Sequence, residues 1–195
     1  MNKRNGLLLL FAVVAAAQLA VPASMIIGRE RTLREGRVFK FRTRPVDPED
    51  AFRGRYVWLS LEPGAVEVPE TGSWLHNQKA YAVLGQDTNG FAVVERLEHS
   101  RPAQVPAVQV RTLWFNDRTR EVNIEWSGLD RYYMEEGKAP QAESAYRSHS
   151  LRTNRTCYVT VRVRGAEAAV ENLFVDERPI RAWLRDHPEE KKAER

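Results

Sequence analysis

The chain is poor in cysteine and histidine, and this shortage excludes several kinds of site. It has one cysteine and four histidines among 195 residues. A single cysteine forms no disulfide within the chain, so the domain must be stabilised by its core alone. The histidines, His76, His99, His149 and His187, stand in loop-like or charged surroundings without the spacing of metal ligands. The sequence therefore predicts no metal site.

Familiar catalytic signatures are also missing. The sequence contains neither a Gly-x-Ser-x-Gly elbow nor a phosphate-binding loop. The thiol of Cys157 belongs to an alternating run in which Cys157, Val159, Val161 and Val163 share one strand face. A thiol on such an apolar face is usually buried and inert. The sequence thus predicts no catalytic residue and no cofactor.

The chain lacks a strong excess of one charge sign. Its 30 Lys and Arg residues against 26 Asp and Glu residues give a net charge of +4. The basic residues are interleaved with acidic ones and do not form a stripe, which argues against a nucleic-acid partner. Arginines concentrate in residues 29–44, where they are placed to contact anionic headgroups. Alternatively, residues 29–37 form a solvated helical stalk with Glu30–Arg34 and Arg31–Glu35 pairs, the interpretation we favour.

Against these absences stands one long apolar run at residues 7–27. As a helix rising about 1.5 Å per residue, it is long enough to cross a hydrocarbon core of about 30 Å. The basic residues Lys3 and Arg4 before it, and a small residue at Ala23, are also compatible with a cleavable signal peptide. Because apolar residues resume at 25–27, we interpret residues 1–28 as an uncleaved anchor that contacts membrane lipid through residues 7–27.

Two features of the sequence favour opposite orientations of this anchor. Arginines just beyond the run favour a cytoplasmic domain under the positive-inside rule. A short basic tail directly before an apolar core is typical of a segment that starts translocation. We give the second signal more weight and expect a single-pass protein of the cytoplasmic (inner) membrane, with most of the chain on the extracytoplasmic side.

Beyond the anchor, alternating apolar residues and turn signals predict mainly strands. We expect a first strand at residues 38–42 and a covered central strand at 55–61, with apolar residues on both faces. Three hairpins follow, pairing residues 80–84 with 91–97, 108–114 with 122–126, and 157–164 with 169–175. A capped turn at residues 45–52 and a short surface helix at 140–150 complete the pattern. The expected fold is mainly β: a single antiparallel domain at 38–184, either a sheet or a partly open barrel of hairpins, behind one transmembrane helix.

Two further expectations concern tryptophans and the C-terminus. Trp114 and Trp126 continue the apolar face of the second hairpin, so we expect both in the core. Trp74 stands in a Gly- and Ser-containing loop and is expected to be exposed. Residues 185–195 are almost all charged and are expected to form a disordered tail.

Two segments, residues 45–59 and 128–137, resemble the two signatures of the GDYXXLXY family of bacterial membrane-anchored proteins. Here the first signature reads Gly54-Arg55-Tyr56-Val57-Trp58-Leu59, with Arg55 and Leu61 where the family name has Asp and Tyr. Glu135 stands where the second signature usually has proline. The resemblance implies a membrane-associated extracytoplasmic protein of uncharacterised function, and it adds no substrate. The candidate binding or motif residues are Asp47, Gly54, Tyr56, Leu59, Arg131, Tyr132, Glu136 and Gly137.

Two functional hypotheses remain. The first is a non-enzymatic module that binds an integral membrane protein or another envelope component through sheet edges and loops. The second is an envelope hydrolase in which Asp47, Asp50 and Glu136 supply an acid and a base. Capping of the turn at residues 45–52 explains the two aspartates without catalysis, so we favour the first hypothesis.

Overall fold

The structure is a computed structural model that describes residues 3–44, 56–69, 74–150 and 156–187. Its helices are α1 (Lys3–Glu35), α2 (Ala139–Ser150) and α3 (Ile180–Asp186). The strands are β1 (Arg37–Arg44), β2 (Tyr56–Trp58), β3 (Ser60–Leu61), β4 (Ala65–Glu67), β5 (Lys79–Gln86), β6 (Ala92–Glu98), β7 (Ala107–Asn116), β8 (Glu121–Trp126), β9 (Arg131–Tyr133), β10 (Cys157–Arg164), β11 (Glu167–Val175) and β12 (Arg178–Pro179).

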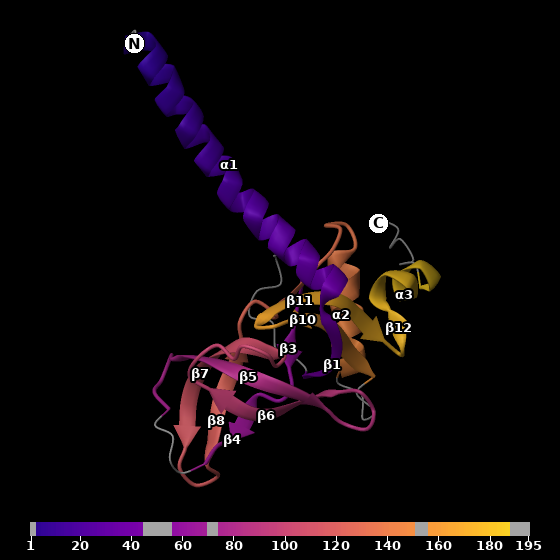
Figure 1. Cartoon of the computed structure of the whole chain (residues 1–195). Coiled ribbons are helices and arrows are strands. Elements are labelled where there is room, and N and C mark those ends of the chain that lie inside the picture. Colours follow the sequence, from indigo (N-terminus) through magenta and orange to yellow (C-terminus); the bar gives the residue numbers. More distant parts are fainter. Residues whose placement is uncertain (1–2, 45–55, 70–73, 151–155, 188–195) are drawn as a thin grey trace.

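Helix α1 stands away from the β domain (Figure 1). It is long and apolar enough to cross a membrane, and its most apolar stretch has no residue buried inside the protein. The helix continues from the predicted anchor into the predicted stalk at residues 29–37, but it ends at Glu35, and β1 begins at Arg37. The predicted pair of Glu30 and Arg34 is present, with 2.8 Å between Oε1 and Nε. The apolar surface of α1 is therefore left for an environment other than the domain itself.

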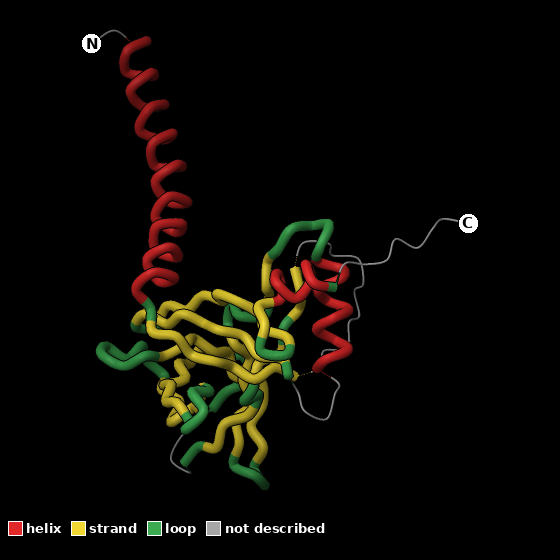
Figure 2. The backbone as a smooth tube through the Cα atoms, turned by 90° about the vertical axis from the view of Figure 1, so that its right-hand side faces the viewer, coloured by secondary structure: helices red, strands yellow, loops and turns green. Residues whose placement is uncertain are grey.

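The strands form two five-stranded antiparallel sheets and a two-stranded ribbon. The first sheet has the order β12-β11-β10-β1-β3, and the ribbon pairs β2 with β9. The second sheet has the order β4-β8-β7-β5-β6, and its edge strands β4 and β6 come into contact, so that it is nearly closed like a barrel. Figure 2 shows these strands gathered below α1, with α2 and α3 at one side. The predicted fold class is confirmed.

The two sheets share one apolar core. Phe39 and Phe41 of β1 are fully buried, and the Phe41 ring meets Trp126 of β8 edge-on with centroids 5.0 Å apart. Burial of aromatic side chains of this size is among the largest contributions to core stability. On the other side of β1, Arg42 lies over the Phe91 ring, with the guanidinium carbon 4.0 Å from the centroid. Contacts on both faces of β1 therefore join the sheets.

The hairpin predictions are confirmed, and the second hairpin departs from them in one detail. The pairs β5–β6, β7–β8 and β10–β11 are all antiparallel. In β7 the register shifts between Thr112 and Phe115, which reverses the alternation of side chains at that point. Trp114 is consequently 57% exposed, so its predicted place in the core is wrong, whereas Trp126 is buried as expected. Trp74, expected to be exposed, packs partly buried against the core and stacks on His99 with ring centroids 4.1 Å apart.

The predicted covered strand at residues 55–61 is also wrong. Residues Tyr56–Trp58 pair with β9, Ser60–Leu61 pair with β1, and Leu59 between them belongs to neither sheet. Among the described residues 56–61, only Val57, Leu59 and Leu61 are buried. The segment is thus a one-sided crossing between two sheets.

Three smaller differences concern the helices and loops. Strand β4 lies outside the strands expected from the sequence. Helix α2, predicted as a surface helix, buries one face that includes Ala142, Tyr146 and His149. Arg185 and Asp186, assigned to the charged tail, belong to α3. Residues 188–195 and the predicted turn at 45–52 lie outside the described residues.

Candidate functional site

The structure brings the described parts of the two signature segments together as one ribbon. Val57 of β2 lies opposite Tyr132 of β9, and Trp58 lies opposite Arg131. The amide of Leu59 continues the pairing by donating a hydrogen bond to the carbonyl oxygen of Asp130, at 2.8 Å. Residues far apart in the sequence therefore form a single candidate site.

Strand alternation gives the ribbon two different faces. Val57 and Tyr132 point into the protein and are buried together with Leu59. Tyr56, Trp58, Arg131 and Tyr133 belong to the other face, where Trp58 is 38% exposed and Tyr133 is 57% exposed. We call these four side chains the aromatic–arginine face.

Arg131 organises the aromatic–arginine face. Its guanidinium carbon lies 5.1 Å from the ring centroid of Tyr56 and 5.3 Å from that of Trp58. Its Nε lies 3.1 Å from a carboxylate oxygen of Asp130. A hydrogen bond with the Tyr133 side chain, and then the Asp130 charge, raise the pKa of Arg131. The face is therefore a set of rings held in place around a permanent positive charge.

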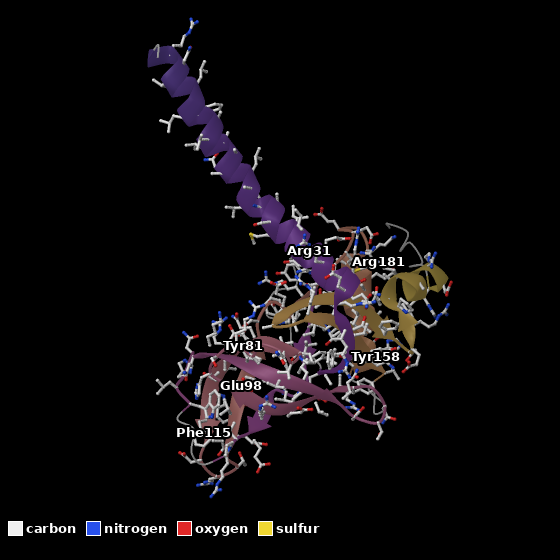
Figure 3. The ribbon with its side chains drawn as sticks, in the orientation of Figure 1. Arg31, Tyr81, Glu98, Phe115, Tyr158 and Arg181 are labelled. Carbon is white, nitrogen blue, oxygen red and sulfur yellow. The ribbon has the colours of Figure 1, made fainter. Side chains whose placement is uncertain are left out.

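The buried side of the ribbon is supported by α3. The Arg181 Nε donates a hydrogen bond of 3.2 Å to the Tyr132 hydroxyl, and this contact raises the pKa of Arg181. The Nη1 atom of Arg181 also lies 3.6 Å from a carboxylate oxygen of Glu135, just after β9. Figure 3 shows Arg181 on the side of the domain near the base of α1, with Phe115 at the far end. The ribbon is thus fixed to α3.

A cleft borders the aromatic–arginine face. It has a volume of about 460 Å³, and Trp58, Leu59 and Asp130 contribute to its wall from the signature segments. The opposite wall includes Ile124 and Trp126 of β8. Because a ring, a carboxylate and apolar side chains line the same opening, the cleft suits an extended side chain of a binding partner.

The remaining predicted site residues lie either after the ribbon or outside the described residues. Glu136 and Gly137 lie exposed in the loop between β9 and α2. Asp47, Asp50 and Gly54 lie outside the described residues, so the acid and base set of the hydrolase hypothesis stays a prediction. In the described part of the chain, no group of three or more His, Cys, Asp or Glu side chains is arranged to hold a metal ion.

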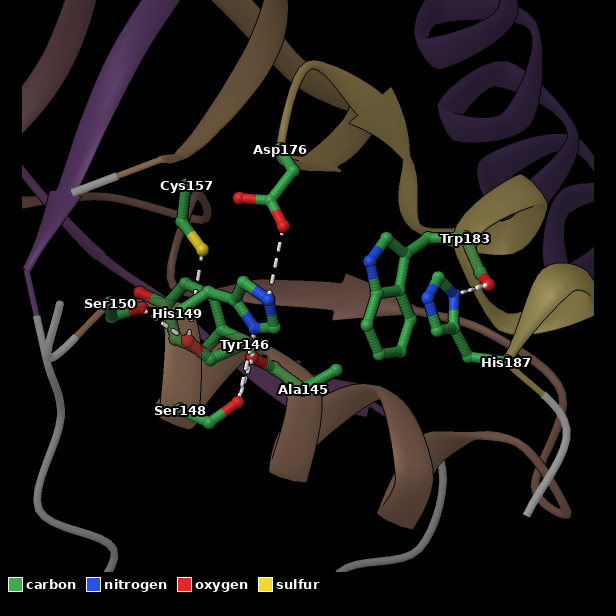
Figure 4. A network of polar contacts seen from close by, with 9 residues as sticks. All are labelled: Ala145, Tyr146, Ser148, His149, Ser150, Cys157, Asp176, Trp183 and His187. Atoms are coloured by element: carbon green, nitrogen blue, oxygen red, sulfur yellow. Dashed lines mark hydrogen bonds and ion pairs between the residues drawn. The ribbon is translucent and has the colours of Figure 1, made fainter. Parts of the chain in front are cut away.

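A second polar cluster surrounds His149 at the end of α2 (Figure 4). The side chain is 5% exposed, and its Nε2 lies 3.1 Å from a carboxylate oxygen of Asp176 in the turn after β11. Its Nδ1 lies 2.8 Å from the carbonyl oxygen of Ala145, and its ring meets Trp183 of α3 edge-on. Sequence reasoning placed this histidine in loop-like or charged surroundings and missed the cluster. Its helical spacing from Ala142 and Tyr146 was the available signal.

Ser148 and Cys157 of this cluster contact backbone carbonyl oxygens of α2. The Ser148 hydroxyl lies 3.0 Å from His149 Nδ1, but the Ala145 carbonyl oxygen also faces that nitrogen. The Ser148 hydroxyl itself donates a hydrogen bond of 3.0 Å to the Ala145 carbonyl oxygen in the same helix. The Cys157 thiol is buried and lies 3.7 Å from the Tyr146 carbonyl oxygen. The cluster therefore joins α2 to α3 and the β11–β12 turn.

The fold and the site together define an antiparallel β protein with one N-terminal apolar helix and a ribbon built from two distant sequence signatures. The family model described as GDYXXLXY protein matches residues 18–173. The chain therefore belongs to the GDYXXLXY family, and the resemblance noted from the sequence is confirmed. No curated protein and no solved structure matches the chain.

Proposed function

We propose that the protein is a membrane-anchored interaction module whose aromatic–arginine face binds an integral membrane protein on the extracytoplasmic side of the cytoplasmic membrane. In this proposal α1 crosses the membrane once, and its exposed apolar residues contact lipid. The β domain then stands at the membrane surface, within reach of proteins in the same bilayer.

The observation that carries the proposal is the composition and exposure of the aromatic–arginine face. Trp, Tyr and Arg are the residues most enriched at the energetic centres of protein interfaces. Here one Trp, two Tyr and one Arg lie side by side, with rings 5.8 to 6.1 Å apart, and Trp58, Tyr133 and the Arg131 side chain are each more than a third exposed. Because Arg131 already contacts two rings, less ordering of the face is required on binding.

Site-specific photocrosslinking in cells tests this proposal. A photoreactive phenylalanine analogue replaces Tyr133 in one variant and Trp114 in a matched control, because both side chains are 57% exposed and Trp114 lies on β7, outside the ribbon. We expect a discrete crosslinked species from position 133 that is lost when Arg131→Ala is added. Equal crosslinking from both positions, or none from position 133, contradicts the proposal.

The membrane side is tested separately with reporters fused to the C-terminus. We expect activity from a reporter that works only outside the cytoplasm. Activity from a reporter that works only inside the cytoplasm would reverse the assigned topology, whatever the crosslinking result.

A further inference from the structure

One side of the last turn of α1 packs against the β domain through Thr32. Thr32 is 2% exposed, although most residues of α1 before it are exposed. Its hydroxyl lies 3.1 Å from the Gly28 carbonyl oxygen and 3.2 Å from a carboxylate oxygen of Glu167, which begins β11. The end of the helix is therefore held by a specific side-chain contact to the first sheet.

Gly36, the residue after α1, is closely surrounded by atoms of α1 and β10. A Cβ placed on Gly36 would lie 3.0 Å from the Val163 amide nitrogen and 3.1 Å from the Arg162 Cβ, and closer still to the Thr32 carbonyl oxygen. The Gly36 amide donates to that carbonyl oxygen at 2.9 Å, which closes the last turn. Helix and strand β10 are thus in backbone contact at the junction.

Two arginines of β10 hold the junction from the strand side. The Arg162 Nη1 donates a hydrogen bond of 3.2 Å to the Gly36 carbonyl oxygen, while its Nε and Nη2 lie 3.0 and 2.9 Å from a carboxylate oxygen of Glu171. The Arg164 side chain lies 4.0 Å from Glu35 in the last turn of α1 and 3.4 Å from Glu167. Charge-assisted hydrogen bonds such as those of Arg162 are roughly twice as strong as neutral ones.

The same region is also connected to the barrel-like sheet. Gly165, in the β10–β11 turn, accepts a hydrogen bond of 2.9 Å from the Ala107 amide at the start of β7. Ala166 of this turn packs on a small apolar cluster formed by Tyr81, Val83 and Ala107. Arg101, before β7, lies 3.9 Å from Glu167. The β10–β11 turn is therefore the place where α1 and both sheets meet.

From these contacts we infer that α1 and the β domain move as one rigid body, with Glu167 at the centre of the junction. The eight residues from Gly28 to Glu35 extend the helix by about 12 Å, and the chain then enters β1 without a linker. If α1 spans the membrane as proposed above, the tilt of the helix fixes the height and direction of the aromatic–arginine face. A flexible tether would instead let that face sample many directions.

Distances between two spin labels test this inference in the full-length chain reconstituted in lipid nanodiscs. The labels are placed at Arg29→Cys, on α1, and Arg118→Cys, at the far end of the barrel-like sheet, since both residues are exposed. The native Cys157 is buried, and the chain without added cysteines is taken through labelling to verify that it does not react. A narrow distance distribution is expected.

The width of the distance distribution is compared with that of two variants and one control. A Gly-Ser insertion of about six residues between Glu35 and Gly36 has a root-mean-square length of roughly 13 Å and sets the width of a flexible joint. Glu167→Ala removes the carboxylate shared by Thr32, Arg101 and Arg164, and it is expected to broaden the distribution towards that width. Glu30→Ala removes the exposed pair with Arg34 within the helix and is expected to leave the width unchanged.

A native chain as broad as the insertion variant would overturn the inference of a rigid body. A native chain that is narrow together with a Glu167→Ala variant that stays equally narrow would overturn the central role of Glu167. Neither result depends on a binding partner or on the membrane side, so failure of the proposed function is recognised independently by crosslinking and by the reporter fusions.

Discussion

Gly36→Ala is the substitution whose effect the structure determines most sharply. In an ordinary helix or turn, Gly→Ala stabilises a protein by about 0.4–1 kcal/mol because the unfolded chain loses freedom. At Gly36 the added Cβ would meet the Thr32 carbonyl oxygen and the Val163 amide nitrogen, which are backbone atoms unable to rotate away. Overpacking of this kind costs about 1–3 kcal/mol. We therefore expect a net destabilisation of about 1–2 kcal/mol, the difference of these two effects.

Gly28→Ala provides the matched control, because no atom lies within 4 Å of a Cβ added there and the residue is inside α1. We expect this variant to be as stable as the native chain or slightly more stable. Urea unfolding of the full-length protein in detergent, followed by tryptophan fluorescence, measures both changes as shifts in midpoint at constant slope. If the two variants shift the midpoint in the same direction, the close packing of the helix–sheet junction is refuted.

Two pH-dependent predictions follow from the contact region between the sheets. The Phe91 amide, and then Arg42, hold the pKa of the Asp87 carboxyl below its ordinary 3.8, so this carboxylate stabilises the fold above that pH and the contribution is lost as pH falls. Asp87→Asn is expected to reduce the fall in the free energy of unfolding between neutral and acidic pH, measured by urea unfolding. An unchanged fall would contradict the assignment of this effect to Asp87. Burial, and then a hydrogen bond to Glu177, raise the pKa of Tyr158 to about 12 from 10.0, so its contribution is complete below pH 10 and declines as pH rises towards 12. Tyr158→Phe is expected to remove that decline, and the ultraviolet absorbance of tyrosinate in the native protein gives the titration directly.

Local patterns predicted much of the fold. Alternating residues and turn signals specify the three long hairpins because both strands of each pair lie close together in the sequence. The buried face of β10, with Cys157, Val159 and Val161, is predicted for the same reason and is confirmed. The bulge that exposes Trp114 left no such signal, since an apolar residue continues the alternation whether or not the register shifts.

The ribbon was beyond prediction from local patterns for a different reason. Each of its strands has three residues, so neither gives enough alternation to define a pairing, and the pairing joins Val57 to the distant Tyr132. The segment predicted as one central strand at residues 55–61 contains two short strands, β2 and β3, which pair with β9 and β1. The resemblance to a known family marked Tyr56, Leu59, Arg131 and Tyr132 as special residues. Their contact, however, was established only by the structure.

The ribbon and the base of α1 are each held to the β domain by specific side-chain contacts. Tyr132 is held by Arg181 of α3, on the side of the domain near the base of α1, while Thr32 and Gly36 fix that base to the first sheet. The Tyr132–Arg181 contact and the junction of α1 with the first sheet are both formed by buried or hydrogen-bonded groups, which seldom open locally in a native protein. In the proposed function, a face presented on such a support would lose little freedom on binding, so its affinity would depend on the membrane geometry of the proposed partner as well as on the contacts themselves.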